Sequence, residues 1–432
     1  MTNALKQLVI YILTWEARLV LLRYKPKIIA VTGSVGKSTT KDAIYAVLSG
    51  RLHVRKSEKS FNSDVGVPLA ILGCENGWKN PFKWLANIAK GFWLILIPQS
   101  YPKWLVLEVG ADRPGDIRKI AGWLKPDIAV LTAIPETPAH VEFFKSSEEL
   151  MKEKFALAES LKPGGTLVLY GDDPKMLESQ RGSQIKKITF GLQAYNDFVA
   201  SHDETIYEDS RPIGTRFRVN YTGSSVPISI FGALGHPPIY AGLSALAVGK
   251  MIGLDLVSIS NALGKWVPPP GRLRILKGLK NSVIIDDAYN SSPTAALTAL
   301  DTLKSMTGAK RRIAILGDML ELGKWSAESH RKLGAKTAEC ADMLLTVGFR
   351  AREVAESAKE AGMKAESIRI YGQNESARAG KELASELQEG DIVLVKGSQG
   401  MRMERAVLEI MEEPKRASEL LVRQEPEWLK KS

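Results

Sequence analysis

A strand, a glycine loop and a helix follow one another near the start of the chain, and this succession most constrains its fold. The β-rich run Lys27–Thr32 leads into the loop GSVGKST at residues 33–39, and a helical pattern continues to Leu48. A loop of this kind binds phosphates through backbone N–H groups and the helix N-terminus. The loop is shorter than the GxxxxGK[ST] pattern, which would place a glycine at Val31. The residues predicted to bind nucleotide here are Gly33, Ser34, Val35, Gly36, Lys37, Ser38 and Thr39, with Lys37 neutralising the outer phosphates and the Ser38 hydroxyl able to ligate Mg²⁺.

Strands and helices alternate on both sides of a proline-rich linker. Before the linker, buried-strand patterns at 104–109, 128–133 and 166–170 are separated by helical ones, and alternating residues at 197–232 suggest a small antiparallel region. Pro268, Pro269, Pro270 and Gly271 form the linker. After it, further strand patterns lie at 283–286, 312–316, 343–347, 367–371 and 391–396.

This alternation predicts an α/β protein with parallel sheets. We expect a P-loop ATPase domain followed by a Rossmann-like domain. The predicted divisions are an amphipathic helix at 1–25, a central P-loop ATP-binding domain at 26–268 with a Trp-rich insertion at 73–104, a carboxy-terminal Rossmann-like domain at 269–411 and a loose, charged tail at 412–432.

Composition is that of a globular protein with an excess of positive charge. Of the 432 residues, 44% are hydrophobic and 25% charged, which excludes disorder throughout. The 59 lysines and arginines against 48 acids give a net charge of +11, which suits phosphates, nucleic acid or an anionic membrane. We see no nucleic-acid recognition module and expect no such partner. Only Cys74 and Cys340 are present, so we expect a reducing, cytoplasmic setting.

Two segments hold much of the positive charge. Residues 1–30 carry five cations against Glu16, and residues 73–104 carry four lysines against Glu75. The first segment is a poor membrane span because charges interrupt it, and its apolar residues share one helical face. That face packs either on the protein's own core or in a membrane interface. The second segment forms either a small core of its own or a second interfacial element, and we favour the interface. The residues on the apolar face of the first segment are Leu5, Leu8, Ile12, Trp15, Leu19 and Leu22.

Eight segments, in order from about residue 27 to residue 411, resemble the Mur ligase family, and within it the type that adds D-alanyl-D-alanine to a muramoyl tripeptide. The resemblance covers nearly the whole chain, and eight ordered segments are far more specific than one motif. The segments read GSVGKSTTKD, FNSDVGVPLAIL, EVGADRPGDI, AHVEFF, GRLRIL, DDAYNSSP, ILGDMLELG and LVKGSQGMRME.

The resemblance implies an ATP- and Mg²⁺-dependent amide ligase of peptidoglycan precursor synthesis. In such a ligase the γ-phosphate of ATP passes to a carboxylate of the muramoyl-peptide acceptor, and the amine of D-alanyl-D-alanine attacks the acyl phosphate. Catalysis of this kind rests on positioning and on neutralising phosphate charge. We expect a monomer in the cytoplasm, with peripheral contact at the inner face of the cell membrane through residues 1–25 and 73–104.

The resemblance also assigns roles to residues that no single pattern would identify. Glu108 and His140 match the family's metal ligands, and Lys154 matches a lysine whose carbamate helps to hold metal. Arg272, Asp287 and Asn290 match nucleotide contacts made across the linker. The residues expected to meet substrate are Asn62, Ser63, Asp318 and Lys396, and the expected catalytic residues are Lys37, His140, Lys154 and Lys396.

The chain departs from the family pattern at three places. Ala156 stands where a glutamate commonly follows the carbamylated lysine, and Pro237 replaces an asparagine expected near the nucleotide. Members of this type also carry an amino-terminal domain that binds uridine diphosphate, whereas here the first strand begins by Lys27. We therefore expect other surfaces to hold the acceptor.

Two other functions fit the same residues. One is another amino-acid-adding Mur ligase or a folylpolyglutamate-type ligase, against which the DDAYNSSP and GDMLELG segments argue. The other is a membrane-associated nucleotide-binding protein without ligase turnover. That alternative gains from Pro237 and Ala156, but it does not explain why the phosphate-binding and metal-binding residues occur together.

Overall fold

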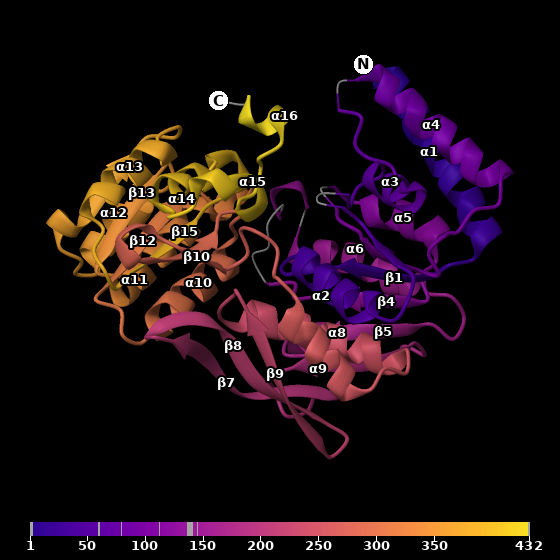
Figure 1. Cartoon of the computed structure of the whole chain (residues 1–432), viewed down its shortest axis with the longest axis horizontal. Coiled ribbons are helices and arrows are strands. Elements are labelled where there is room, and N and C mark those ends of the chain that lie inside the picture. The colour runs from indigo at the N-terminus through magenta and orange to yellow at the C-terminus, as the bar shows by residue number, and fades with distance from the viewer. Residues whose placement is uncertain are drawn as a thin grey trace.

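Two α/β parts, one after the other along the chain, make up the protein (Figure 1). The structure, a computed structural model, describes residues 3–58, 61–78, 80–111, 113–135, 141–144 and 146–430. Each part is built on one sheet, and the proline-rich linker joins the two. The predicted α/β fold class is confirmed.

The first sheet has nine strands in the order β2-β3-β1-β4-β5-β6-β7-β8-β9. From β2 to β7 all neighbours pair in parallel, and β7, β8 and β9 then continue the sheet as an antiparallel meander. The antiparallel region predicted at 197–232 is therefore an extension of the parallel sheet. The strands are β1 (Lys27–Thr32), β2 (Val54–Lys56), β3 (Trp104–Glu108), β4 (Ile128–Leu131), β5 (Thr166–Tyr170), β6 (Lys186–Gly191), β7 (Phe198–Glu208), β8 (Arg211–Tyr221) and β9 (Ser224–Phe231).

Helices cover both faces of this sheet because successive strand side chains point to opposite sides. On β1, Ile28 and Ala30 join one hydrophobic core, whereas Ile29 and Val31 join the other. The first core lies under α1 (Asn3–Tyr24), α3 (Gly66–Leu72), α4 (Pro81–Leu96), α5 (Asp116–Leu124) and α6 (Ser147–Glu159), and the second under α2 (Lys37–Ser49), α8 (His236–Met251) and α9 (Leu256–Lys265).

The second sheet has six strands in the order β10-β11-β15-β12-β13-β14. All pairs are parallel except the edge pair of β10 and β11. The five predicted strands are present, and β10 is an addition that the sequence patterns did not reveal. The strands are β10 (Arg274–Lys277), β11 (Val283–Asp287), β12 (Arg311–Gly317), β13 (Met343–Val347), β14 (Ile368–Tyr371) and β15 (Asp391–Lys396).

Helices also cover both faces of the second sheet. One core lies under α10 (Pro293–Ser305), α11 (Ser326–Cys340) and α12 (Arg352–Glu360), and the other lies under α13 (Ser376–Glu386) and α14 (Glu404–Ile410). Short helices complete the structure. The remaining helices are α7 (Pro174–Glu178), α15 (Ala417–Leu420) and α16 (Pro426–Leu429).

Among the described residues after 412, one segment packs on the second domain, so the prediction of a loose tail is wrong. Leu421 and Val422 are buried, and the Arg423 guanidinium forms a buried ion pair of 3.0 Å with Glu404. The charges of this segment therefore serve packing as well as solvation. They fix the end of the chain on the second sheet beside β11, since Arg423 also donates to the Ala288 carbonyl.

Helix α1 packs on the core, but the face that does so is not the apolar face identified from the sequence. Leu13 and Ala17 are fully buried against the first core, whereas Leu8, Trp15 and Leu22 are exposed. In the described part of the chain, no helix has both the length and the apolar character that crossing a membrane requires.

Candidate active site

The glycine loop between β1 and α2 has the backbone conformation expected of a phosphate-binding turn. Gly33 has a φ of 138°, and a Cβ at this position would lie 2.1 Å from the Thr132 hydroxyl oxygen. Gly36 has a φ of 85° and directly precedes the first residue of α2. Only glycine satisfies both requirements at Gly33, because L side chains rarely adopt this φ and no space remains for one.

Glu108, the last residue of β3, lies beside this loop. The Ser38 hydroxyl donates a 2.8 Å hydrogen bond to one carboxylate oxygen, and the Asn62 amide donates one of 3.2 Å to the other. The carboxylate is buried at 4% exposure. Parallel strands β1 and β3 are neighbours and end at the same edge of the sheet, which brings the loop and Glu108 together.

Two opposing effects set the charge state of Glu108. Burial by itself raises the pKa of this carboxyl, but the nearby charges of Lys41 and Lys37 and the hydrogen bond from Ser38 outweigh it. Arg272, from beyond the linker, acts in the same direction. The net result is a pKa below the usual value, so Glu108 is an anion ready to hold a cation.

Lys41, one turn into α2, is a residue that the sequence patterns did not identify. Its side chain is 3% exposed, and its ammonium donates a 2.8 Å hydrogen bond to the Ser57 carbonyl and lies 3.5 Å from the Asp42 carboxylate. Lys56 forms the closer ion pair with Asp42, at 2.7 Å. Lys41 therefore supplies positive charge behind the glycine loop. No sequence signal marks it, because a lysine one turn into a helix is ordinary.

A cavity of about 350 Å³ opens in front of the glycine loop, between the two α/β parts. Residues from both sides of the linker line it, so the structure brings together positions that are more than 350 residues apart in the sequence. The predicted residues that line it are Ser34, Val35, Gly36, Thr39, Arg272, Asp287, Asn290 and Lys396.

Lys396 and Asp287 face this cavity as a buried pair. The Lys396 ammonium lies 2.5 Å from the Asp287 carboxylate and also donates to the Asn290 carbonyl at 3.1 Å. Strands β11 and β15 are parallel neighbours, and these two residues are partners in their register. The other Asp287 oxygen accepts from the Leu273 N–H, which ties the strand to the linker.

Asp286, the neighbour of Asp287, fixes the linker itself. It is fully buried and accepts hydrogen bonds from the backbone N–H groups of Gly271 at 3.0 Å and Ala288 at 3.1 Å. Burial raises its pKa to about 7. Asp286 thus positions Arg272, the next residue after Gly271, whose guanidinium stacks 4.0 Å from the ring centroid of Tyr289.

Aromatic residues form the far wall of the same cavity. Tyr170 and Tyr240 meet edge to face with centroids 5.1 Å apart, and the Tyr240 hydroxyl donates to Asp172 at 3.2 Å. His236 and Pro237, from the segment that departs from the family pattern, also line it. This wall has the apolar rings and polar tips that suit a planar, partly polar group such as a nucleotide base.

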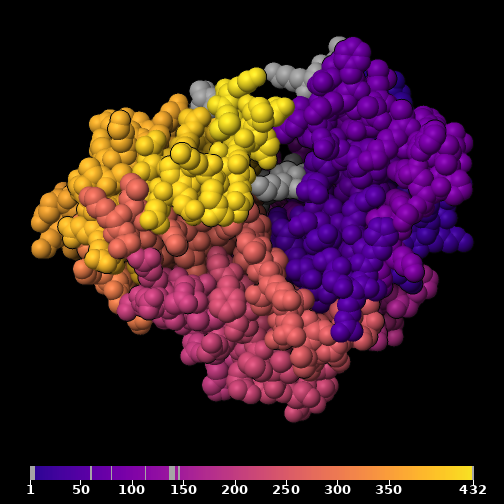
Figure 2. All heavy atoms as spheres, viewed as in Figure 1, coloured from indigo at the N-terminus to yellow at the C-terminus, as the bar shows by residue number. Residues whose placement is uncertain are grey.

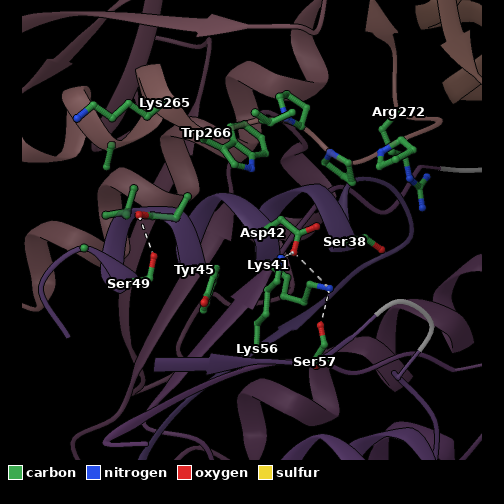
Figure 3. A pocket seen from close by; sticks show the side chains of 18 of the residues that line it. Ser38, Lys41, Asp42, Tyr45, Ser49, Lys56, Ser57, Lys265, Trp266 and Arg272 are labelled. Atoms are coloured by element: carbon green, nitrogen blue, oxygen red, sulfur yellow. Dashed lines mark hydrogen bonds and ion pairs between the residues drawn. The ribbon is translucent and has the colours of Figure 1, made fainter. Parts of the chain in front are cut away.

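A larger cavity of about 940 Å³ lies on the other side of α2 (Figure 3). Lys41 and Tyr45 of α2 face it from one side, and Trp266 and Arg272 face it from the linker side (Figure 3). Ser38 also lines it. Arg272 lines both cavities, so the two meet beside the glycine loop. In the space-filling view the surface is hollowed between the indigo part and the yellow carboxy-terminal part (Figure 2).

The predicted site residues Lys154, Ser63 and Asp318 line neither cavity. Lys154 is buried in α6 but lines neither cavity, and Ser63 accepts from the Gly66 N–H at the start of α3. Asp318 is buried, accepts from the Ala351 N–H at 2.7 Å and also lines neither cavity. His140 lies outside the described residues. Within the described ranges, no group of three or more His, Cys, Asp or Glu side chains is placed to hold a metal ion.

These features define a site for a nucleotide held by two domains. The loop and helix N-terminus suit phosphates, the aromatic wall suits a base, and Arg272 adds positive charge from the second domain. Such an arrangement serves transfer of a phosphoryl group, in which positioning and charge neutralisation do most of the catalysis.

Two family models match the chain, one on each side of the linker. Residues 31–248 match the family described as "Mur ligase middle domain", and residues 271–399 match "Mur ligase, glutamate ligase domain". The chain therefore belongs to the Mur ligase family, which confirms the predicted family.

Individual relatives agree with this assignment. The chain is 31% identical over 389 residues to UDP-N-acetylmuramoyl-tripeptide–D-alanyl-D-alanine ligase of Bacillus subtilis (strain 168), covering 90% of this chain and 76% of that protein. The ligase of the same name in Escherichia coli (strain K12) is 26% identical, over 89% and 77% of the two chains. Among solved structures, the MurF ligase from Thermotoga maritima in complex with ADP matches with a TM-score of 0.76 and 26% identity, over 94% of this chain and 84% of that one.

Proposed function

We propose that this protein joins D-alanyl-D-alanine to a muramoyl-peptide carboxylate at the expense of ATP, in peptidoglycan precursor synthesis. An acceptor carboxylate oxygen attacks the γ-phosphorus, and the bond between this phosphorus and the leaving ADP breaks. The dipeptide amine then attacks the acyl carbon, phosphate leaves and the amine loses a proton. The observation that carries the proposal is the cavity shared by the glycine loop and by Arg272, Asp287, Asn290 and Lys396.

The smaller cavity is the proposed ATP site. The β- and γ-phosphates lie against Gly33–Thr39, and Lys37 neutralises their charge. The base lies against Tyr170 and Tyr240. The T. maritima relative, solved with ADP, supports nucleotide binding by this fold.

Mg²⁺ fits beside the phosphates. This ion prefers oxygen ligands and is commonly held by one or two carboxylates together with substrate phosphates. The Ser38 hydroxyl and the Glu108 carboxylate are 2.8 Å apart, and the pKa of Glu108 is lowered, so a hard, anionic pair of donors is present. The metal would add charge neutralisation at the transferred phosphoryl group. His140 and a carbamylated Lys154 remain proposed ligands of a second ion.

The larger cavity is the proposed acceptor site. It reaches Ser38 and Arg272, where an acceptor carboxylate must meet the γ-phosphate. Trp266 also lines this cavity, and its indole N–H is buried without a hydrogen-bond partner among the described residues. Asn62 donates a hydrogen bond to Glu108 beside this site. Ser63 and Asp318 remain proposed substrate contacts, made when the two domains close on the substrate.

We place the protein in the cytoplasm as a monomer, with peripheral contact at the inner face of the cell membrane. The net charges of +4 in residues 1–30 and +3 in residues 73–104, both segments rich in apolar side chains, support this contact.

Isotope transfer tests the acyl-phosphate step. With acceptor labelled with ¹⁸O in its carboxylate, the proposal requires one labelled oxygen to leave in the released phosphate, because the carboxylate oxygen that attacks phosphorus departs with it. Phosphate without label would mean that ATP is hydrolysed by water and that the acceptor is not activated.

A further inference from the structure

The outer face of α1 is apolar, although it faces away from the core. Leu8, Tyr11, Trp15 and Leu22 follow one another at spacings of three, four and seven residues, so they form one stripe along the helix. Their exposed fractions are 53%, 71%, 46% and 69%. A surface helix normally turns polar residues outward and one apolar stripe inward. Helix α1 has an apolar stripe on each side.

Helix α4 has the same character. Trp84 and Leu94 pack into the core, while Phe82, Leu85 and Leu96 are 78%, 63% and 73% exposed. Phe92 and Trp93 are also exposed. More than half of the exposed large apolar side chains in the described ranges lie on α1, on α4 or directly beside α4.

The two apolar stripes form one surface. Helices α1 and α4 lie side by side at one end of the molecule (Figure 1). Exposed Trp15 and exposed Phe92 contact each other, with ring centroids 6.2 Å apart, so the stripes meet on the outer side. The Tyr24 hydroxyl donates to the Leu94 carbonyl at 3.0 Å and fixes the pair. We call this the α1–α4 surface, made of Leu5, Leu8, Tyr11, Trp15, Leu22, Phe82, Leu85, Phe92, Trp93 and Leu96.

The charges around the α1–α4 surface identify what it binds. Every lysine and arginine of α1 and α4 is exposed, and Lys25 follows directly. Glu16 is the only acid in either helix, and it is fully buried against Gly91, with a pKa that burial raises to about 7. The exposed rim is therefore cationic except at Glu75, which lies 4.0 Å from Lys83. The cations of the two helices are Lys6, Arg18, Arg23, Lys83 and Lys90.

A second copy of the chain does not suit this rim. In a twofold-symmetric dimer the same patch would face itself and oppose like charges. An anionic lipid surface is complementary to the α1–α4 surface in charge and in apolar character. Its headgroups attract lysine and arginine, and its interfacial region accepts Trp, Tyr and Phe rings together with Leu side chains.

We propose that the α1–α4 surface lies in the interface of a bilayer containing anionic phospholipid, with its apolar stripes among the headgroups and upper acyl chains. This inference rests on the peripheral membrane contact included in the proposed function, and it names the surface and the lipid chemistry. The cations at the rim then contact lipid phosphates. Binding is reversible and weakens as salt rises.

Co-sedimentation of the full-length chain with vesicles tests this proposal. One set contains phosphatidylglycerol with phosphatidylcholine, and the other contains phosphatidylcholine alone. The patch variant replaces three exposed side chains of the surface, and the control replaces three side chains of similar exposure elsewhere. The variants are Tyr11→Ser/Leu85→Ser/Leu96→Ser and Val257→Ser/Phe349→Ser/Ile370→Ser.

We expect the wild type and the control to sediment with the anionic vesicles, and the patch variant to bind at least about tenfold more weakly. Arg18→Gln/Lys83→Gln should remove most of the dependence on phosphatidylglycerol, whereas Lys186→Gln/Lys364→Gln should not. Equal binding by the patch variant and the control would overturn the proposal. So would a wild-type dimer that the patch variant dissociates, since the occupant would then be a second copy.

ADP affinity in solution separates this inference from the enzymatic one. The patch variant should keep its melting temperature and its ADP affinity while losing the vesicles. Loss of thermal stability, ADP affinity and vesicle binding together would mean that the three substitutions disrupt the fold. The comparison of Arg18→Gln/Lys83→Gln with Lys186→Gln/Lys364→Gln, whose side chains are all exposed, would then decide whether the surface binds lipid. Absence of ADP binding in the wild type would contradict the ligase proposal and leave the vesicle result unaffected.

Discussion

The Ser38 hydroxyl and the Glu108 carboxylate are joined by a 2.8 Å hydrogen bond, although 70 residues separate them in the sequence. One follows the lysine of the glycine loop and the other ends the neighbouring strand. This pair links the glycine loop to the proposed metal site. It is the relationship on which the proposed chemistry depends most directly.

Glu108→Gln should lower the apparent affinity for Mg²⁺ at least about tenfold and the rate of phosphate release on the order of a hundredfold. The reason is that a neutral amide does not replace the carboxylate opposite Lys41 and Lys37. The measurement is a Mg²⁺ titration of ATP turnover. Glu159→Gln, at an exposed carboxylate of α6, is the control and should behave as the wild type. An unchanged Mg²⁺ titration in Glu108→Gln would remove this residue from the metal site.

Gly33→Ala should weaken ADP binding at least about tenfold, because its Cβ would lie 2.1 Å from the Thr132 hydroxyl oxygen and force the loop to move. Calorimetric titration with ADP measures the effect. Gly122→Ala, in α5, meets no atom within 4 Å and serves as the matched control. If both variants bind ADP equally, the loop does not hold the phosphates.

Lys396→Met should lower the free energy of unfolding by about 3 kcal/mol, because it leaves the Asp287 carboxylate buried without its partner. Lys396→Met/Asp287→Asn should recover part of that loss, yet remain inactive if the pair serves the reaction. Urea unfolding and phosphate release measure the two effects separately. Recovery of activity in the double variant would show that the pair is only structural.

Glu16→Gln should make stability less dependent on pH. Burial raises the pKa of Glu16 from 4.5 to about 7, so the folded chain keeps a proton that the unfolded chain releases in this range. Stability therefore falls as the pH rises through this window, and the variant should gain roughly 1 to 3 kcal/mol relative to the wild type between about pH 5 and pH 8. Urea unfolding at the two pH values measures the gain. Glu356→Gln, at an exposed position, is the control and should show no gain in stability. If the stability of Glu16→Gln depends on pH as strongly as that of the wild type, the raised pKa of Glu16 is contradicted.

Much of the fold could be predicted because its signals are local. The strand, glycine loop and helix at 27–48 and the strand patterns beyond the linker each depend on neighbouring residues, and all appear in the structure. The tail after residue 412 was misjudged because its charges resemble those of a solvated segment. Its anchoring depends on a pairing between Arg423 and Glu404 that only the tertiary structure creates.

Site residues that belong to a sequence motif could be predicted. Site residues whose importance comes from burial in the folded chain could not. Ser38, Asp287 and Lys396 line the cavities as expected. Lys41 and Asp286 were missed, because a lysine in a helix and an acid at the end of a strand are ordinary in sequence. They gain importance only when the fold buries them beside the loop and the linker.

The outer face of α1 shows a different limit. The apolar face recognised in the sequence, including Leu8 and Trp15, is the exposed one, and a second apolar set containing Leu13 and Ala17 meets the core. Periodicity reveals that a helix has an apolar face, but it does not decide which of two such faces the rest of the chain covers.

Phosphate release from ATP, measured with and without muramoyl tripeptide and D-alanyl-D-alanine, tests the central claim most directly. The ligase proposal requires rapid release only when both substrates are present, with the amide product formed in equal amount. Release at the same rate without either substrate, or no release with both, would contradict it.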